Sequence, residues 1–293
     1  MGRGKTDCGT SASPDMWLNE AFVPLEKAGI ALMDRGFLYG DGVFETIRAQ
    51  MGRVLYLDDH LGRLASALDA LRIPCPRPPA ELSWSSLISE LLMRNGLACE
   101  LASVKIIVTR GVAGVLGLPT PTGPSTLCVT AQSYAPPPSE MYATGWRLHI
   151  WREGFAPPTA PFKTLNYLPF LMARQSALDA GAHEAVLLDH GGCVTETAAG
   201  SLLLCTDGRW WTPRSPWQLP GITLKQAMRL LDTGGKQIMR RPCSPDELIK
   251  ADTVWVLNSL MGIMPVAEVT GHTVPELRAE EAGKLRETLW LEE

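Results

Sequence analysis

Two residues in the second half of the chain could together perform covalent chemistry on an aldehyde. Lys163 lies in the segment FKTLNYLPF, and Glu196 lies in GGCVTETAAGS. A lysine attacks an aldehyde only as the neutral amine, and apolar neighbours such as Phe162 and Leu165 lower the pKa of an amine by desolvation. A carboxylate such as Glu196 can hydrogen-bond a pyridine nitrogen and keep that ring protonated. An imine-forming amine and a ring-nitrogen partner are the groups that a pyridoxal phosphate enzyme needs most.

Four ordered segments give this pair its context, because an isolated lysine in a loop is usually only a surface cation. They are MDRGFLYGDGVFETIRAQMGRVLYLDDHLGRLASALDAL, KTLNYLPFLMARQSALDAGAHEAVLLDHGGCVTETAAGSLLL, LPGITLKQAMRLL and NSLMGIMPV. From about Trp17 to Val266 the chain resembles the fold type IV family of pyridoxal phosphate enzymes. The resemblance implies a two-domain α/β (α+β) fold like that of D-amino-acid aminotransferases, pyridoxal 5'-phosphate as cofactor, and a homodimer.

Composition restricts the classes of protein to which the chain can belong. With 293 residues and 45% hydrophobic side chains it can bury one large or two ordinary domain cores. Its net charge of −4 argues against a nucleic-acid-binding surface, which needs clustered Lys and Arg. No apolar run approaches transmembrane length. We therefore expect a cytoplasmic enzyme with a small-molecule substrate and neither a nucleic-acid nor a membrane partner.

The cysteines and histidines do not indicate a metal site. Seven cysteines, an odd number without any CxxC pair, are typical of reduced thiols. The five histidines are scattered, and His183 and His190 bracket the apolar run AVLL, as residues at strand ends do. We expect no metal in this protein.

The chain divides into four parts by composition. Residues 1–16 are polar and lack the apolar core of a signal peptide, so we predict a disordered leader. We predict an N-terminal α/β domain over 17–132 and a C-terminal α/β domain over 142–293, which carries Lys163. The segment 133–141 between them contains three consecutive prolines, which cannot continue a helix or a central strand, and it is the predicted linker.

Hydrophobic periodicity predicts the elements of the N-terminal half. The segment FETIRAQMGRVLYL indicates two strands that turn at Met51 and Gly52. Asp58 is then expected to cap a helix. The apolar stripe of that helix consists of Leu61, Leu64, Ala65, Leu68 and Leu71. A second helix is predicted at about 79–93 and strands at 103–109 and 125–131, and we expect the Gly/Pro-rich loop between these strands to border the site.

Strands and helices alternate in the C-terminal half, which is typical of an α/β domain. We predict strands at 146–151, 184–189, 200–205 and 253–257, and helices at 167–181, 222–232 and 277–291.

The resemblance implies a phosphate site made of backbone and side-chain donors. Pro220 and Gly221 open a helix, and the free amides of Ile222 and Thr223 could hold a dianion at its positive end. Arg63 occupies the family's phosphate-binding arginine position, where a guanidinium can make two hydrogen bonds. Ser259 matches a hydroxyl that contacts the same phosphate, and Tyr167 matches a phenol that lies against the ring hydroxyl of the cofactor.

These residues serve the cofactor and do not name the reaction. D-amino-acid aminotransferases carry TRGxxPRxH in one loop, whereas this chain has TRGVAGVLG, with Val115 and Gly117 in place of the substrate-binding Arg and His. Branched-chain aminotransferases receive the α-carboxylate of the substrate on a GTA-type turn, which aligns with Asn258, Ser259 and Leu260 here. The chain departs from both patterns.

The stretch NSLMGIMPV is similar instead to the NxLM…PV stretch of 4-amino-4-deoxychorismate lyases, in which the asparagine can hydrogen-bond the substrate. We therefore predict a lyase that forms 4-aminobenzoate and pyruvate for folate synthesis. Lys163 is the expected base, and Phe44, Arg110, Asn258 and Leu260 are the expected substrate contacts. Two alternatives stay open: an aminotransferase acting on branched-chain or other amino acids, and a protein that keeps the fold without the chemistry.

Overall fold

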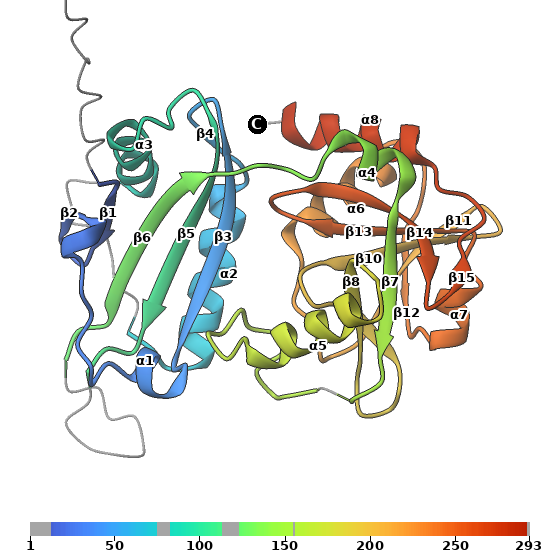
Figure 1. Cartoon of the computed structure of the whole chain (residues 1–293), viewed down its shortest axis with the longest axis horizontal. Coiled ribbons are helices and arrows are strands. Elements are labelled where there is room, and N and C mark those ends of the chain that lie inside the picture. Colours follow the sequence, from blue (N-terminus) through green and yellow to red (C-terminus); the bar gives the residue numbers. More distant parts are fainter. Residues whose placement is uncertain (1–12, 75–82, 113–122, 155, 292–293) are drawn as a thin grey trace, which may run out of the picture.

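The computed structural model describes residues 13–74, 83–112, 123–154 and 156–291, and two β-sheets organise them (Figure 1). The strands of the N-terminal sheet are β1 (Asp15–Leu18), β2 (Ala21–Pro24), β3 (Gly42–Gln50), β4 (Arg53–Val54), β5 (Leu101–Thr109) and β6 (Thr126–Ser133). They are antiparallel throughout, in the order β2-β1-β6-β5-β3-β4. The predicted hairpin is confirmed, because β3 pairs with β4 around Met51 and Gly52.

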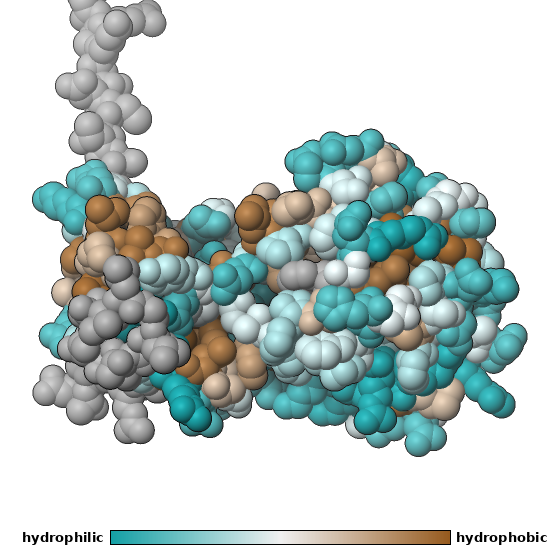
Figure 2. Space-filling view, turned by 90° about the horizontal axis from the view of Figure 1, so that it is seen from below, coloured by the Kyte–Doolittle hydropathy of each residue, from teal (hydrophilic) through white to brown (hydrophobic). Residues whose placement is uncertain are grey.

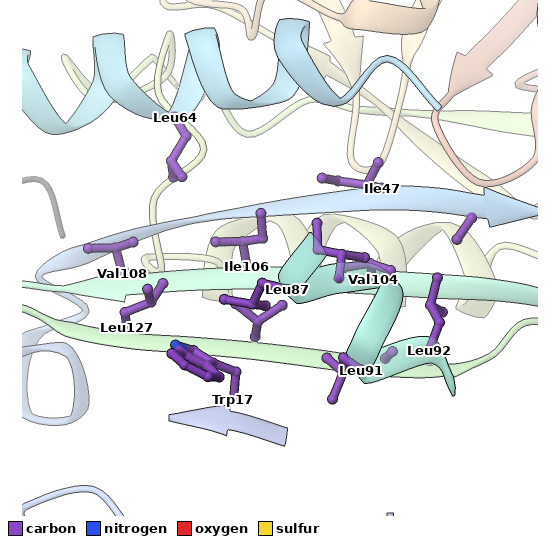
Figure 3. Packing of buried hydrophobic residues seen from close by; sticks show 14 of the residues in the cluster. Trp17, Ile47, Leu64, Leu87, Leu91, Leu92, Val104, Ile106, Val108 and Leu127 are labelled. Carbon is purple, nitrogen blue, oxygen red and sulfur yellow. The ribbon is translucent and has the colours of Figure 1, made fainter. Parts of the chain in front are cut away.

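Alternation along the strands gives the N-terminal sheet one apolar face. The helices of this half are α1 (Arg35–Tyr39), α2 (Leu57–Ala70) and α3 (Trp84–Arg94), together with a short 3-10 turn, η1 (Leu25–Lys27). Leu64 of α2 and Leu87 of α3 join Ile47, Val104 and Ile106 of the strands in one buried cluster (Figure 3). The opposite face of β3 and β5 is turned toward the C-terminal sheet, because residues of period two point to opposite sides.

The C-terminal sheet is larger and mixed. Its strands are β7 (Trp146–Trp151), β8 (Glu184–Leu188), β9 (Val194–Thr197), β10 (Ser201–Thr206), β11 (Arg209–Pro213), β12 (Met239–Arg241), β13 (Thr253–Asn258), β14 (Gly262–Val269) and β15 (His272–Thr273). The order is β12-β11-β10-β13-β14-β7-β8-β9, with β15 paired to β14. The sheet curls, so that β9 at one end also lies against β10 and β11.

Five helices accompany this sheet in the described ranges: α4 (Ser139–Thr144), α5 (Leu168–Asp179), α6 (Ile222–Thr233), α7 (Pro245–Ile249) and α8 (Ala279–Leu291). A parallel β7–α5–β8 unit and an antiparallel β13–β14 hairpin occur in the same sheet. Together with the antiparallel N-terminal sheet, this arrangement confirms the predicted α/β (α+β) fold class. No helix in the described ranges has the length and apolarity needed to cross a bilayer.

The structure corrects several local predictions. Asp58 does not cap α2: the N-cap is Tyr56, whose left-handed backbone turns the chain, and Asp58 lies in the first helical turn, where its charge faces the positive end of the helix dipole. Ala65 is exposed and does not belong to the buried stripe, which includes His60 and Ala67 instead.

The predicted leader and linker also differ from the structure. Asp15 and Met16 pair with β2 and Met16 is buried, so these two residues of the predicted leader belong to the N-terminal sheet. Ser139 starts α4 inside the predicted linker, where Pro138 is a suitable residue to precede a helix. The start of the second predicted helix, the middle of the Gly/Pro-rich loop with Val115 and Gly117, and most of the leader lie outside the described residues.

Candidate active site

A cavity of about 470 Å³ lies where the two sheets face each other. Its walls come from β3 and β5 of the N-terminal sheet and from α6, β9, β13 and the loops beside them in the C-terminal half. The sequence-predicted residues that line it are Phe44, Arg63, Lys163, Tyr167, Glu196, Ile222, Thr223, Asn258, Ser259 and Leu260. Residues more than 200 positions apart in the sequence therefore share one chamber.

Backbone pairing with the N-terminal sheet positions Lys163. The Phe44 amide donates to the Lys163 carbonyl at 2.8 Å, and the Leu165 amide donates to the Gly42 carbonyl at 3.0 Å. Desolvation lowers the pKa of Lys163 to about 8, with a further lowering by the charge of Arg63. The ammonium nitrogen lies 4.6 Å from the centre of the Phe44 ring, whose face favours a cation when it is charged. Lys163 is thus an amine that can be neutral near physiological pH.

Glu196 lies on β9 at the floor of the cavity. Its side chain is buried, and its carboxylate oxygens accept hydrogen bonds from the Leu219 amide at 3.2 and 3.3 Å. Burial raises the pKa of Glu196 to about 8, against the lowering by the Leu219 hydrogen bond and the charge of Lys163. A cationic hydrogen-bond partner in the cavity would stabilise the charged form of this carboxyl group, and a protonated pyridine nitrogen would be such a partner.

Tyr167 stands beside Lys163 at the N-terminus of α5. Its hydroxyl donates to the Ala198 carbonyl at 3.0 Å, and its ring packs edge-to-face on Phe44 with the centroids 5.5 Å apart. Burial raises the pKa of Tyr167 to about 12, so the hydroxyl remains a hydrogen-bond donor. The aromatic pair forms an apolar wall on one side of the amine.

The first turn of α6 and the side chain of Arg63 form a cup suited to an anion. The N-cap of α6 is Gly221, which has no side chain to satisfy the first amides of the helix, and a Cβ at this position would collide with Ser201 Oγ. Ile222 and Thr223 line the cavity, and in the described part of the chain no capping side chain satisfies their backbone amides at the positive helix end. Arg63 crosses from α2 and donates to the Pro220 carbonyl at 2.9 Å, which holds its charge at this helix start.

The side chain of Asn258 stabilises the turn between β13 and β14 by hydrogen bonds. Asn258 Oδ1 accepts hydrogen bonds from the Leu260 amide at 3.1 Å and from the Met261 amide at 2.9 Å, and Nδ2 donates to the Ala199 carbonyl at 3.2 Å. The side chain of Asn258 is thus largely engaged by its own backbone, which the sequence does not reveal. Ser259, the next residue of the turn, also lines the cavity.

Arg110 does not reach the cavity. It is buried and pairs with Asp41 through Nε at 2.8 Å, while Nη1 and Nη2 donate to the carbonyls of Arg72 and Leu71. The structure therefore does not support the predicted substrate contact of Arg110, because the half-buried carboxylate of Asp41 and two carbonyls satisfy its guanidinium. Its observed role is to connect the end of α2 to the turn between α1 and β3.

Lys105 lines the cavity and was missed from the sequence. It lies on β5 between the buried Val104 and Ile106, so its side chain points to the opposite face, toward the chamber. Its ammonium nitrogen is 4.7 Å from the centre of the Phe44 ring. A charged residue within an otherwise apolar β-branched run was the signal that could have identified it.

A second missed group lies behind the cup. Glu45 and His60 are each 1% exposed and bond to each other, and Glu45 also makes a bidentate ion pair with Arg63. In the part of the chain that the structure covers, no three His, Cys, Asp or Glu side chains come together as metal ligands would.

Comparison with known proteins agrees with this geometry. The family model for aminotransferase class IV matches residues 42–269. A Methanocaldococcus jannaschii protein with a provisional name as a branched-chain-amino-acid aminotransferase is 32% identical over 271 residues, which cover 92% of each chain. The aminodeoxychorismate lyase of Vibrio harveyi is 28% identical over 279 residues, covering 93% of this chain and 97% of the relative.

A solved structure shows the same fold with a cofactor. The T.th. branched-chain amino acid aminotransferase, determined with pyridoxamine 5'-phosphate, has a TM-score of 0.84 and 28% identity, covering 95% of this chain and 93% of that one. The family uses pyridoxal phosphate, and the donor set of the cavity fits it: an amine, a buried carboxyl group and an anion cup. The chain belongs to the aminotransferase class IV family of fold type IV pyridoxal phosphate enzymes.

Proposed function

We propose that the chain is a 4-amino-4-deoxychorismate lyase that forms 4-aminobenzoate and pyruvate for folate synthesis. The observation that carries this proposal is the self-satisfied turn at Asn258. In branched-chain aminotransferases the aligned turn receives the α-carboxylate of the substrate, whereas here the amide of Leu260 already donates to Asn258 Oδ1. An amide occupied in this way is a poor carboxylate receptor, because binding would require an existing hydrogen bond to break.

The charge of Lys105 supports a substrate with more than one carboxylate. 4-Amino-4-deoxychorismate carries a ring carboxylate and an enolpyruvyl carboxylate, while the aliphatic side chain of valine or leucine carries none. Lys105 reaches the cavity from β5, and no ion pair to it occurs among the residues that the structure describes. A charge-assisted hydrogen bond from its ammonium to one of the carboxylates would orient the ring.

Pyridoxal phosphate, when bound, supplies the electron sink that stabilises negative charge on the substrate carbon beside the amino group. In our proposal Arg63, Ser259 and the amides of Ile222 and Thr223 hold its phosphate, Tyr167 contacts its ring hydroxyl, and Glu196 partners its ring nitrogen. These assignments come from the family resemblance and are supported by the shared cavity.

The remaining chemistry falls to Lys163. Its neutral amine removes the proton from C4 of the substrate, the bond between C3 and the ether oxygen breaks, and enolpyruvate leaves and becomes pyruvate after protonation. The ring becomes aromatic in this step, which makes it strongly favourable. Phe44 and Tyr167 form an apolar wall beside the amine and keep its pKa near the pH at which it must act as a base.

A second candidate function is an aminotransferase for branched-chain or other amino acids. The 32% identity to the archaeal relative and the fold of the aminotransferase solved with pyridoxamine 5'-phosphate favour it. The two functions differ in one half-reaction: an aminotransferase must accept an amino group from an amino acid and leave the cofactor in its amine form, and a lyase need not. A D-amino-acid aminotransferase is less favoured by the TRGVAGVLG loop.

The proposal includes a homodimer in the cytoplasm. Exposed apolar side chains lie on α1 and α5. A hydrogen bond from Asn166 Nδ2 to the Gly40 carbonyl connects the segments beside these two helices. Figure 2 shows hydrophobic surface between the two lobes on the underside. The side chains are Phe37, Leu38, Tyr39, Leu168, Leu171 and Met172. Such a patch is typical of a protein–protein contact. Sedimentation of the purified protein tests the dimer, and cell fractionation tests the location.

The half-reaction separates the two functions. Purified protein loaded with pyridoxal phosphate is mixed with L-leucine, L-valine or L-glutamate, and the absorbance of the cofactor is followed. The lyase proposal predicts that the aldehyde form persists over many minutes. Rapid and complete conversion to the amine form by any of these amino acids would favour the aminotransferase instead.

A further inference from the structure

Behind the anion cup, a buried acid and a buried histidine connect the two side chains assigned to the phosphate. Glu45 Oε2 lies 2.7 Å from His60 Nδ1, and both side chains are shielded from solvent. Glu45 also accepts from Arg63 Nε at 2.8 Å and from Arg63 Nη2 at 2.7 Å. The other ring nitrogen, His60 Nε2, lies 3.5 Å from Ser259 Oγ, the outer limit of a hydrogen bond. One chain of contacts thus runs from Arg63 to Ser259.

The charge of Glu45 decides which nitrogen of His60 carries a proton. The side-chain hydrogen bonds from Arg63 and His60 hold the pKa of Glu45 below its ordinary value despite its burial, so Glu45 is a carboxylate and only accepts. His60 Nδ1 must therefore carry a hydrogen. When the imidazole is neutral, Nε2 is a bare acceptor, and it can contact Ser259 only if the hydroxyl hydrogen points toward the ring.

That direction conflicts with binding an anion. A phosphate dianion needs the hydroxyl hydrogen of Ser259 to point toward its own oxygens, because phosphate at neutral pH mainly accepts hydrogen bonds. If the hydroxyl turns to the phosphate, a neutral His60 loses its partner at Nε2 inside a buried site. A second proton on Nε2 removes the conflict, since the ring then donates to Ser259 Oγ while Ser259 donates to the phosphate.

The electrostatic field around His60 acts in the same direction. Burial lowers the pKa of His60, and the positive charges of Arg63 and Lys163 lower it further against the raising effect of Glu45. A dianion placed beside Arg63 and Lys163 offsets those positive charges. The charged or titratable groups around His60 are Glu45 and Arg48 on β3, Tyr56 before α2, Asp59 and Arg63 on α2, and Lys163 before α5, while Thr223, Leu289 and Trp290 contribute no charge.

We propose that His60 is a proton-linked positioning residue of the phosphate site: it takes up a proton when a phosphate dianion binds, and thereby turns the hydroxyl of Ser259 toward the ligand. The inference rests on the phosphate position proposed above. Affinity for a dianion is then independent of pH above the pKa of ligand-bound His60, rises as the pH falls below that value, and levels off below the pKa of ligand-free His60. Glu45 keeps the relay oriented by fixing both Arg63 and the Nδ1 hydrogen.

Inorganic sulfate is a suitable probe because its charge does not change over the titration range of histidine. The full-length protein, freed of cofactor and labelled with ¹⁵N-histidine, is titrated with acid by NMR in the absence and presence of saturating sulfate, and the His60 signals are assigned from their loss in His60→Gln. We expect sulfate to raise the pKa of His60 by about one unit or more, equivalent to about a tenfold linkage. An unchanged pKa in the presence of bound sulfate overturns the relay.

Calorimetry of sulfate and absorbance titration with pyridoxal phosphate supply a second readout. Wild-type affinity for sulfate should fall as the pH rises through the His60 range, whereas His60→Gln, whose amide N–H donates permanently toward Ser259, should show no such fall. The same pH dependence in His60→Gln contradicts the proposal. Arg63→Met is the control for the site itself. If this variant binds sulfate and pyridoxal phosphate as tightly as wild type, the proposed phosphate position is wrong. If it loses both ligands but sulfate leaves the pKa of His60 in wild type unchanged, only the relay is wrong.

Discussion

The amide of Phe44 donates a 2.8 Å hydrogen bond to the carbonyl of Lys163, so the reactive lysine is attached to a strand of the other sheet. The bond from the Leu165 amide to the Gly42 carbonyl is a second backbone hydrogen bond between the same two segments. Phe44 and Lys163 are far apart in the sequence. The position of the amine therefore depends on how β3 packs against the loop before α5, and this dependence leads to the first prediction.

Replacing Gly42 with alanine should displace this loop. A Cβ at residue 42 would lie 2.5 Å from the Val108 carbonyl oxygen and 2.8 Å from Leu165 Cδ1, closer than real contacts allow. We expect Gly42→Ala to lower the free energy of unfolding by about 1–3 kcal/mol, as overpacking does, and to slow cofactor attachment to Lys163. Urea unfolding and absorbance measure the two effects. Gly62→Ala is the matched control, because a Cβ there meets nothing within 4 Å; equal behaviour of both variants would refute the prediction.

The rate at which Lys163 captures pyridoxal phosphate should depend on pH with a midpoint near 8. Desolvation lowers the pKa of Lys163 to about 8 from 10.5. The neutral, reactive amine therefore becomes the major form as the pH rises through about 8, well before an ordinary lysine loses its proton. Stopped-flow absorbance of cofactor-free protein should show a rate that rises from pH 6 and levels off above about 8. Free lysine is the reference, and a protein rate that keeps rising in parallel with it would disprove the lowered pKa.

Lys105→Met should weaken substrate binding more than turnover. The ammonium faces the cavity, and a charge-assisted hydrogen bond to a substrate carboxylate contributes about 1.5–3 kcal/mol. We expect KM for 4-amino-4-deoxychorismate to rise about tenfold to a hundredfold, with a smaller change in kcat. Lys27→Met changes an exposed lysine of η1 and should leave both constants as in wild type. An unaltered KM in Lys105→Met would exclude a carboxylate contact.

Glu184 should make the stability of the protein depend on pH. It is 1% exposed on β8, and burial raises its pKa to about 7 from 4.5. Between these values the native state holds a proton that the unfolded state releases, so the contribution of Glu184 is fully present below about pH 4.5 and is lost as the pH rises through about 7.

The variant Glu184→Gln isolates this contribution. The free energy of unfolding of wild type minus that of Glu184→Gln should fall by about 1.4 kcal/mol per pH unit between about pH 5 and pH 7. Urea unfolding at several pH values measures it, with the exposed Glu287→Gln as a control that should give a flat difference. A flat difference for Glu184→Gln as well would show that this carboxyl group titrates normally in the folded protein.

The sequence was most informative where one residue type has one use. Three residues illustrate this: Gly42 in GDGVFET, Lys163 in KTLNYL and Gly221 at the start of α6. The chemistry requires the backbone conformation or the reactive group of their segments, and all three lie at or beside the cavity. Periodicity also predicts some of the elements, since buried and partly exposed residues alternate along most of β6 and α2 carries an apolar stripe.

The errors concern side chains whose partners lie far away in the sequence. Arg110 is a plausible anion binder by type, but Asp41 and two carbonyls of the α2 terminus occupy it, and no local pattern reveals them. Asn258 lines the cavity as predicted, but the sequence does not reveal that its oxygen accepts hydrogen bonds from the amides of Leu260 and Met261. Lys105 and His60 were overlooked because a lone lysine in a strand and a lone histidine in a helix have ordinary explanations until the tertiary fold shows what they face.

The central claim is tested most directly by the products. Cofactor-loaded protein is given 4-amino-4-deoxychorismate, and 4-aminobenzoate and pyruvate are quantified, with Lys163→Ala as the control. We predict equal amounts of the two products from wild type and their loss in Lys163→Ala. Absence of both products from a protein that still transaminates leucine or valine would contradict the lyase assignment and make the chain an aminotransferase.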